Sequence, residues 1–230
     1  MKIYANSPMK RLIPILLACL ALGCTSKKST HASIEQTDSL LCELHERDQQ
    51  IRHELMRVQR AFIVEQRAEL VDSIVMLVEE EGRTDSLNRV VVDSLLQNGW
   101  PEGLSEQSNQ TIWLIIDHGD VEYQERYLPM IEQQAMRGII SLADYATLSD
   151  RVNVRRQRPQ RYGTQTGYTQ RDGKTFTYVY PIEDISKLDS LRLSVGLDSM
   201  HIYLRQVSET LGTSVAIDTT LTWETLSALQ

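Results

Sequence analysis

The sequence predicts a mainly α-helical domain with one long amphipathic helix on its N-terminal side and a single β-hairpin. Apolar residues recur at steps of three, four or seven between positions 38 and 82, as on one face of a helix. Helix start and stop signals then repeat as far as residue 212. Between Pro159 and Pro181 the composition changes to alternating Thr and Tyr, which is typical of strands. With 230 residues, 41% of them hydrophobic, the chain is long enough to bury a core.

The first 23 residues are predicted to be a signal peptide. Lys10 and Arg11 precede an apolar run, 12–22, which is too short to span a bilayer as a permanent helix. Translation starting at Met9 gives a tidier basic region than a start at Met1. The segment Leu20-Ala-Leu-Gly-Cys24 resembles the lipobox of bacterial lipoproteins, although Ala21 stands where Leu is usual, and residues 16–19 form a shorter competing match.

The lipobox resemblance implies that Cys24 is the lipidation site, carrying acyl chains such as palmitate. Cys19 then leaves with the signal peptide and Cys42 remains alone, so the mature chain has no internal disulfide. We therefore expect a membrane partner through the lipid on Cys24 and a location in the cell envelope, at the periplasmic or outer-membrane face. A net charge of -7 makes nucleic acid an unexpected partner.

Residues 24–37 are polar and are predicted to form a flexible tether. Thr37-Asp38 offers an N-cap to the long helix, which we expect to run from 38 to Gly82 as one helix or as two with a break. The apolar spacing also fits a coiled coil. Because Asp48 and Glu65 interrupt the apolar seam, packing of this helix along its own domain is the better interpretation.

Residues 83–212 are predicted to form a helical domain. Helices are expected from Thr84 to Asn98-Gly99, over 109–118, from Gly119-Asp120 to Gly138, over 141–154, over 185–195 and over 198–211. A hairpin over 164–180 turns at Asp172-Gly173, a sequence that favours a two-residue turn. Residues 213–230 form a C-terminal arm, either an edge strand or loosely docked.

The densest group of reactive side chains lies between Asn98 and Gln165. It contains, in order, the motifs Gly99-Trp-Pro101, His118-Gly-Asp120, Gln124, Leu128-Pro129, Asp150-Arg151 and Gln160-Arg-Tyr-Gly-Thr-Gln165. This order resembles the domain of unknown function 6624 family over about residues 85–205, extending to Pro181-Ile-Glu-Asp184, Arg192 and Val195-Gly-Leu197. Asp117 departs from the family pattern, which usually has Gln or a similar amide there. The resemblance implies a domain boundary and no established activity.

Three residues in this stretch are candidates for catalysis. His118 has the chemistry of a general acid or base, with Asp120 or Asp150 to orient it. The alternative is a histidine that interacts with the dipole of the helix it ends. These three residues form a weak metal-binding set, and we predict no metal site.

A second group is predicted to bind a ligand through hydrogen bonds or charge, and consists of Arg151, Gln160, Tyr162, Gln165 and, from its place in the family pattern, Gln124. Arg151 has a structural alternative, an ion pair with Asp117 or Asp120. The amides could equally satisfy the backbone of a loop. Six arginines between 151 and 171 are better explained as partners of neighbouring acidic helices than as an anion site.

Three classes of function stay open. The first is a membrane-anchored binding module for a polar or anionic ligand of the cell envelope. The second is a hydrolase-like enzyme with His118 as its base, although the sequence has no strong nucleophile, nucleotide or zinc motif. The third is a structural envelope protein that contacts a partner through the long helix. Binding ranks first because no nucleophile is evident.

Overall fold

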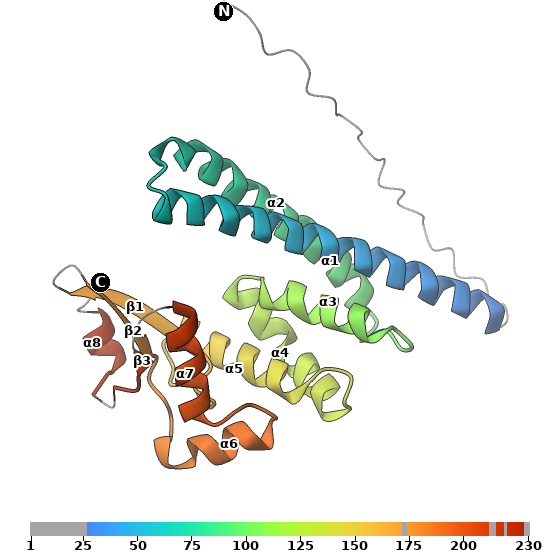
Figure 1. Ribbon diagram of the computed structural model, residues 1–230. Coiled ribbons are helices and arrows are strands. Elements are labelled where there is room, and N and C mark those ends of the chain that lie inside the picture. The colour runs from blue at the N-terminus through green and yellow to red at the C-terminus, as the bar shows by residue number, and fades with distance from the viewer. Residues whose placement is uncertain (1–26, 172–173, 212–214, 219, 228–230) are drawn as a thin grey trace, which may run out of the picture.

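A computed structural model describes residues 27–171, 174–211, 215–218 and 220–227. The fold is mainly α-helical, as predicted, with a small sheet at one end (Figure 1). The expected signal peptide, 1–23, and the expected lipidation site, Cys24, lie outside the described residues. Within the described residues, no helix combines the length and the apolar character needed to cross a bilayer.

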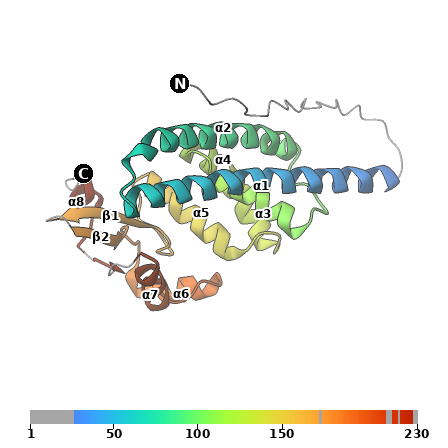
Figure 2. The ribbon, with the colours of Figure 1, turned by 45° about the horizontal axis from the view of Figure 1, so that its top comes forward.

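The N-terminal part is a helical hairpin made of α1 (Lys27–Val64) and α2 (Val71–Leu96), which lie side by side (Figures 1 and 2). A short connection, ending in the 3-10 helix η1 (Ala68–Leu70), separates them. The chain turns at Gln66, whose φ of 54° is in the left-handed region. The helix end expected at Gly82 is wrong, because Gly82 lies inside α2. The chain does form two helices with a break, which was one of the two alternatives. Packing of α2 against α1 overrides the roughly 1 kcal/mol that a mid-helix glycine costs.

Helix α1 also begins earlier than expected, at Lys27, so the prediction of a flexible tether is wrong from that residue onward. Asp38 is inside the helix and does not cap it. Its carboxylate instead accepts hydrogen bonds from the backbone N–H and the hydroxyl of Ser105, at 3.0 and 3.1 Å. Ser105 is the N-cap of α3 (Glu106–Asp117), so Asp38 fixes α1 to the start of α3.

Three further helices complete the main body, and each was predicted: α3, α4 (Val121–Met136) and α5 (Leu142–Arg155). Ser105, Asp120 and Ser141 cap their N-termini through side-chain hydrogen bonds. The core joins all five helices through buried residues including Leu41, Leu44, Val92, Ile112, Ile116, Ile131 and Leu148. Because the apolar residues of α1 are buried in this core, the long helix packs along its own domain, as preferred over a coiled coil.

The C-terminal part contains the predicted hairpin, β1 (Thr166–Arg171) and β2 (Lys174–Val179), paired antiparallel from Thr166↔Val179 to Arg171↔Lys174. The turn residues Asp172 and Gly173 lie outside the described residues. The helical segments that follow are η2 (Ile185–Lys187), α6 (Leu188–Ser194) and α7 (Met200–Leu211). The C-terminal arm supplies an edge strand, β3 (Val215–Ala216), parallel to β2, and then α8 (Trp223–Ser227). A separate small core, including Val179, Leu188, Met200 and Val215, holds these elements together.

Candidate functional site

Asp150, predicted to be catalytic, anchors a loop. It is fully buried on α5, and its carboxylate accepts hydrogen bonds from the backbone N–H groups of Arg161, Tyr162 and Thr164 and from the hydroxyl of Thr164, at 2.7–3.1 Å. Burial raises the pKa of Asp150, although these backbone hydrogen bonds act in the opposite direction. Both oxygens are occupied within the protein, so Asp150 does not orient His118.

Gln160 and Gln165 complete the same loop. The side-chain amide of Gln160 donates to the carbonyl oxygens of Gln165 and Tyr180, at 3.0 and 2.9 Å, and its oxygen accepts from the Gln165 N–H at 2.9 Å. Tyr162 is buried, and Arg192 donates to its carbonyl oxygen at 2.7 Å. The predicted ligand-binding residues Gln160, Tyr162 and Gln165 therefore belong to a hydrogen-bond network that closes the 160–165 loop.

His118 lies apart from that loop, at the C-terminal end of α3. Its Nδ1 is 3.1 Å from a carboxylate oxygen of Asp48 on α1, a residue that is only 1% exposed. Asp48 therefore has the orienting role that was expected of Asp120 or Asp150, and that expectation is wrong. The His118 side chain is 17% exposed, so the ring contacts the buried Asp48 and still reaches solvent.

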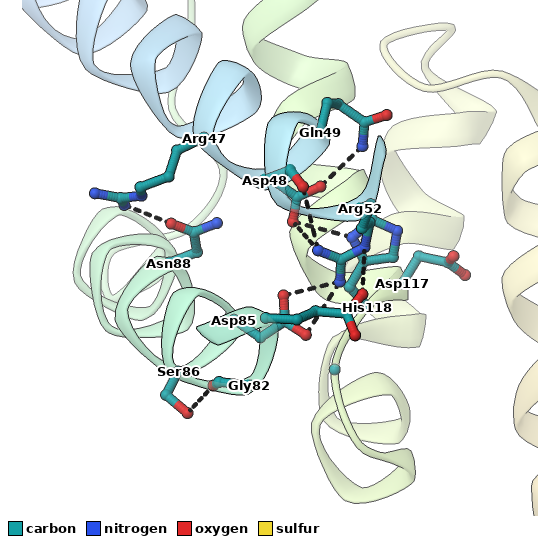
Figure 3. Close-up of polar contacts among 12 residues, drawn as sticks. Arg47, Asp48, Gln49, Arg52, Gly82, Asp85, Ser86, Asn88, Asp117 and His118 are labelled. Atoms are coloured by element: carbon teal, nitrogen blue, oxygen red, sulfur yellow. Dashed lines mark hydrogen bonds and ion pairs between the residues drawn. The ribbon is translucent and has the colours of Figure 1, made fainter. Parts of the chain in front are cut away.

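Arg52 links this pair to α2 (Figure 3). Its guanidinium is 3.1 Å from Asp48 and 2.8 Å from Asp85 of α2, and Glu81 lies 3.6 Å away. Burial would raise the pKa of Asp48, but the hydrogen bond and charge of His118, together with the charge of Arg52, hold it below its usual range. The carboxylate of Asp48 is therefore ionised at neutral pH, where it can hold the imidazole in one tautomer.

Asp117, next to His118, forms a buried ion pair with Arg151 at 2.7 Å, which confirms one of the alternatives for Arg151. Burial raises the pKa of Asp117 despite the opposing charge of Arg151. Gln124, fully buried on α4, donates its amide to the Asp117 carbonyl oxygen at 2.5 Å. Arg151 and Gln124 thus both contact Asp117, the last residue of α3, and stabilise the end of the helix that carries His118.

Asp120 and the exposed arginines have structural partners. Asp120 caps α4 by accepting from the Tyr123 N–H at 2.9 Å, and it forms an ion pair with Arg89 at 2.6 Å. The Tyr123 hydrogen bond and Arg89 lower the pKa of Asp120. Arg156 and Arg158 pair with acidic residues of α4, as expected for a solvated face.

The cluster of His118, Asp48, Arg52 and Asp85 is the candidate functional site, and sequence analysis identified only its histidine. The three missed residues lie on α1 and α2, outside the stretch of motifs. One signal was present, because Asp48 interrupts the apolar face of α1. A carboxylate at a core position needs a cationic or hydrogen-bonding partner, and His118 and Arg52 are those partners.

The arrangement suits two kinds of chemistry. An imidazole held by a carboxylate at one nitrogen presents the other nitrogen as a base or a hydrogen-bonding group. A second possibility is metal coordination, because donor atoms of Asp48, Asp85 and His118 lie within 4.8 Å of one another. Asp120 and Asp150, the carboxylates considered with His118 at first, do not belong to this group.

Fold and site together define a mainly α-helical protein in which a helical hairpin holds a histidine at the end of a third helix. The chain belongs to the family of unknown function DUF6624, which it matches over residues 35–216. The match begins well before residue 85, so most of α1 and the whole of α2 are part of the family domain. No curated protein and no solved structure matches this chain.

Replacing Asp150→Asn is expected to lower the free energy of unfolding by about 2–4 kcal/mol, because one acceptor becomes an NH₂ group that faces backbone donors. Urea unfolding followed by circular dichroism measures this loss. Asp144→Asn, on the same helix, is the control and should cost less than about 1 kcal/mol. Equal losses in the two variants would contradict an anchoring role for Asp150.

Replacing Asp48→Asn should cost about 2–4 kcal/mol at pH 7, since a buried partner of His118 and Arg52 loses its charge. The pKa of Asp48 is lowered by folding, so its contribution is present above the unfolded pKa of about 3.9 and is lost as pH falls through the folded value. The difference from wild type should therefore shrink below about pH 4. Unfolding curves at pH 7 and pH 3 test this, with the exposed Asp72→Asn as control. A difference that does not depend on pH would show that ionised Asp48 is not the stabilising form.

Proposed function

We propose that the protein is a lipid-anchored component of the cell envelope that binds a polar ligand at His118. The observation that carries this proposal is the contact between Asp48 and His118 Nδ1. A buried carboxylate fixes the ring, and the imidazole remains partly exposed at the junction of α1, α2 and α3. A histidine that only stabilised the C-terminal end of α3 would not require the buried carboxylate of Asp48, which lies 70 positions away in the sequence.

The envelope location rests on the sequence of the N-terminal segment. The apolar run 12–22 and Cys24 have the order of a signal peptide followed by a lipidation site. Several acyl chains on one cysteine hold a protein stably at a bilayer, whereas a single chain binds marginally. On this proposal α1 begins only a few residues after the lipid.

A second candidate function, acid–base catalysis of hydrolysis, is favoured by the same contact. A carboxylate at Nδ1 holds the imidazole with its other nitrogen free to accept a proton from water, as in catalytic pairs of this type. In this candidate Asp48 is the orienting residue, and water is the nucleophile. Binding and catalysis differ in how strongly they depend on the basicity of His118.

Replacing Cys24→Ser should abolish lipid attachment and release the protein from membranes into the soluble fraction. Labelling with radioactive palmitate and fractionation of the expressing cells measure the two effects. Cys42→Ser is the matched control, because Cys42 is exposed on α1 and should have no influence on either result. Palmitate incorporation that persists in Cys24→Ser would contradict lipidation at this residue.

Replacing His118→Gln separates the two candidate functions, because glutamine keeps hydrogen bonding and removes the base. Binding predicts a loss of about tenfold in affinity for a polar probe, glycerol 3-phosphate, measured by calorimetry. Catalysis predicts a loss of about 10²–10⁴-fold in hydrolysis of p-nitrophenyl acetate or p-nitrophenyl phosphate. His53→Gln, on an exposed part of α1, is the control. Wild-type protein that neither binds nor hydrolyses these probes would count against both functions.

A further inference from the structure

We propose that Asp48, Asp85 and His118 are the ligands of a divalent first-row metal ion such as Mn²⁺ or Zn²⁺, and that Arg52 competes with this ion. The inference rests on the proposed function, because it names the class of ligand that the His118 site takes. It replaces the expectation of no metal site, which considered His118 together with Asp120 and Asp150.

The positions of the donor atoms support the proposal. Asp48 on α1, Asp85 on α2 and His118 at the end of α3 each offer one atom, all within 4.8 Å of one another. Ligands bound at 2.0–2.2 Å to one ion are at most about 4.4 Å apart, so the three atoms are close to a coordinating arrangement. Asp85 is only partly buried, with 18% of its side chain exposed, and a small side-chain rotation can close the remaining gap.

The types of donor indicate the class of metal. One imidazole and two carboxylates suit ions that accept both nitrogen and oxygen, such as Zn²⁺ and Mn²⁺. The second oxygen of Asp48 already accepts a hydrogen bond from Gln49 at 2.8 Å. Such a bond orients a ligating carboxylate, as outer-shell partners do in known metal sites.

Asn88 provides an independent observation. This residue of α2 is fully buried, its oxygen accepts a hydrogen bond from Arg47, and its NH₂ group has no partner among the described residues. Figure 3 shows that NH₂ group on the side of Asn88 that faces Asp48 and Asp85. A buried donor without a partner is costly, and a water or hydroxide bound to the metal would accept its hydrogen bond.

Arg52 explains how the same carboxylates remain compensated when no ion is bound. Its guanidinium lies 2.8–3.1 Å from Asp85 and Asp48, and it supplies one positive charge where a metal ion would supply two. Glu81 is already within 3.6 Å of Arg52. When an ion binds the two aspartates, Arg52 can therefore keep Glu81 as its partner, and affinity in the wild type is set by this competition.

The test is a titration of the full chain with Mn²⁺, followed by electron paramagnetic resonance, and with Zn²⁺, followed by calorimetry. Arg52→Met removes the competing cation and should bind Mn²⁺ at least tenfold more tightly than the wild type. Its melting temperature should rise when Mn²⁺ is added, because the ion replaces the lost positive charge. Arg57→Met is the matched control, since Arg57 is on the same helix and pairs with Glu54. It should bind as the wild type does.

Two further variants keep the proposal falsifiable. Adding Asp85→Asn to Arg52→Met should abolish the gain in affinity. If Arg52→Met does not fold, the wild type and Asp85→Asn are compared at millimolar Mn²⁺, where only the wild type should bind. Equal affinity in Arg52→Met and Arg57→Met, or binding unchanged by Asp85→Asn, would overturn the metal site. Binding of glycerol 3-phosphate that persists in EDTA would then show that the polar-ligand function stands without it.

Discussion

The structure depends on one buried charge, the carboxylate of Asp48. Taking an ionised carboxylate out of water is expensive unless cations and hydrogen-bond donors surround it. Here His118, Arg52 and Gln49 meet that requirement, and they come from α1 itself and from the end of α3. Because Arg52 also binds Asp85, the same charge sets the register of α1 against both α2 and α3. A shift of α1 by one turn would separate the Asp48 carboxylate from His118 and the Arg52 guanidinium from Asp85.

A second buried carboxylate, Asp150, is satisfied in a different way. Its partners are chiefly backbone N–H groups of the 161–164 loop, which cannot move away without unfolding that loop. The partners of Asp48 are long side chains that reach solvent and can change position. The two carboxylates have similar chemistry in the sequence, yet Asp150 closes a loop, whereas Asp48 lies beside a histidine that reaches solvent. This difference is the physical reason for placing function at His118.

Much of the fold could be predicted from the sequence because its signals are local. The helices α4 and α5 follow Asp120 and Ser141, which were predicted starts and whose side chains cap them. Helix α3 begins earlier than expected, at Glu106, after its cap Ser105. The hairpin was predicted from alternation and a turn sequence. A break in the long helix was one of two alternatives, but its position was not predicted, since the chain turns at Gln66 in the left-handed region, where glycine is more common. Gly82 was interpreted as a helix end, but packing against α1 keeps α2 continuous.

The site was less predictable, because its members meet only through tertiary packing. Residue types suggested that His118 and Asp150 belong together, yet Asp150 is committed to its loop and Asp48 lies 70 positions from His118. The sequence signal that pointed to the site was a residue that breaks the apolar pattern of α1. Between Leu44 and Leu55, the buried face of α1 includes an acid in place of an apolar residue. An acid at a core position is tolerated only where the fold supplies partners for its charge. The position of Asp48 therefore predicts that a cationic or hydrogen-bond-donating side chain packs against this part of α1.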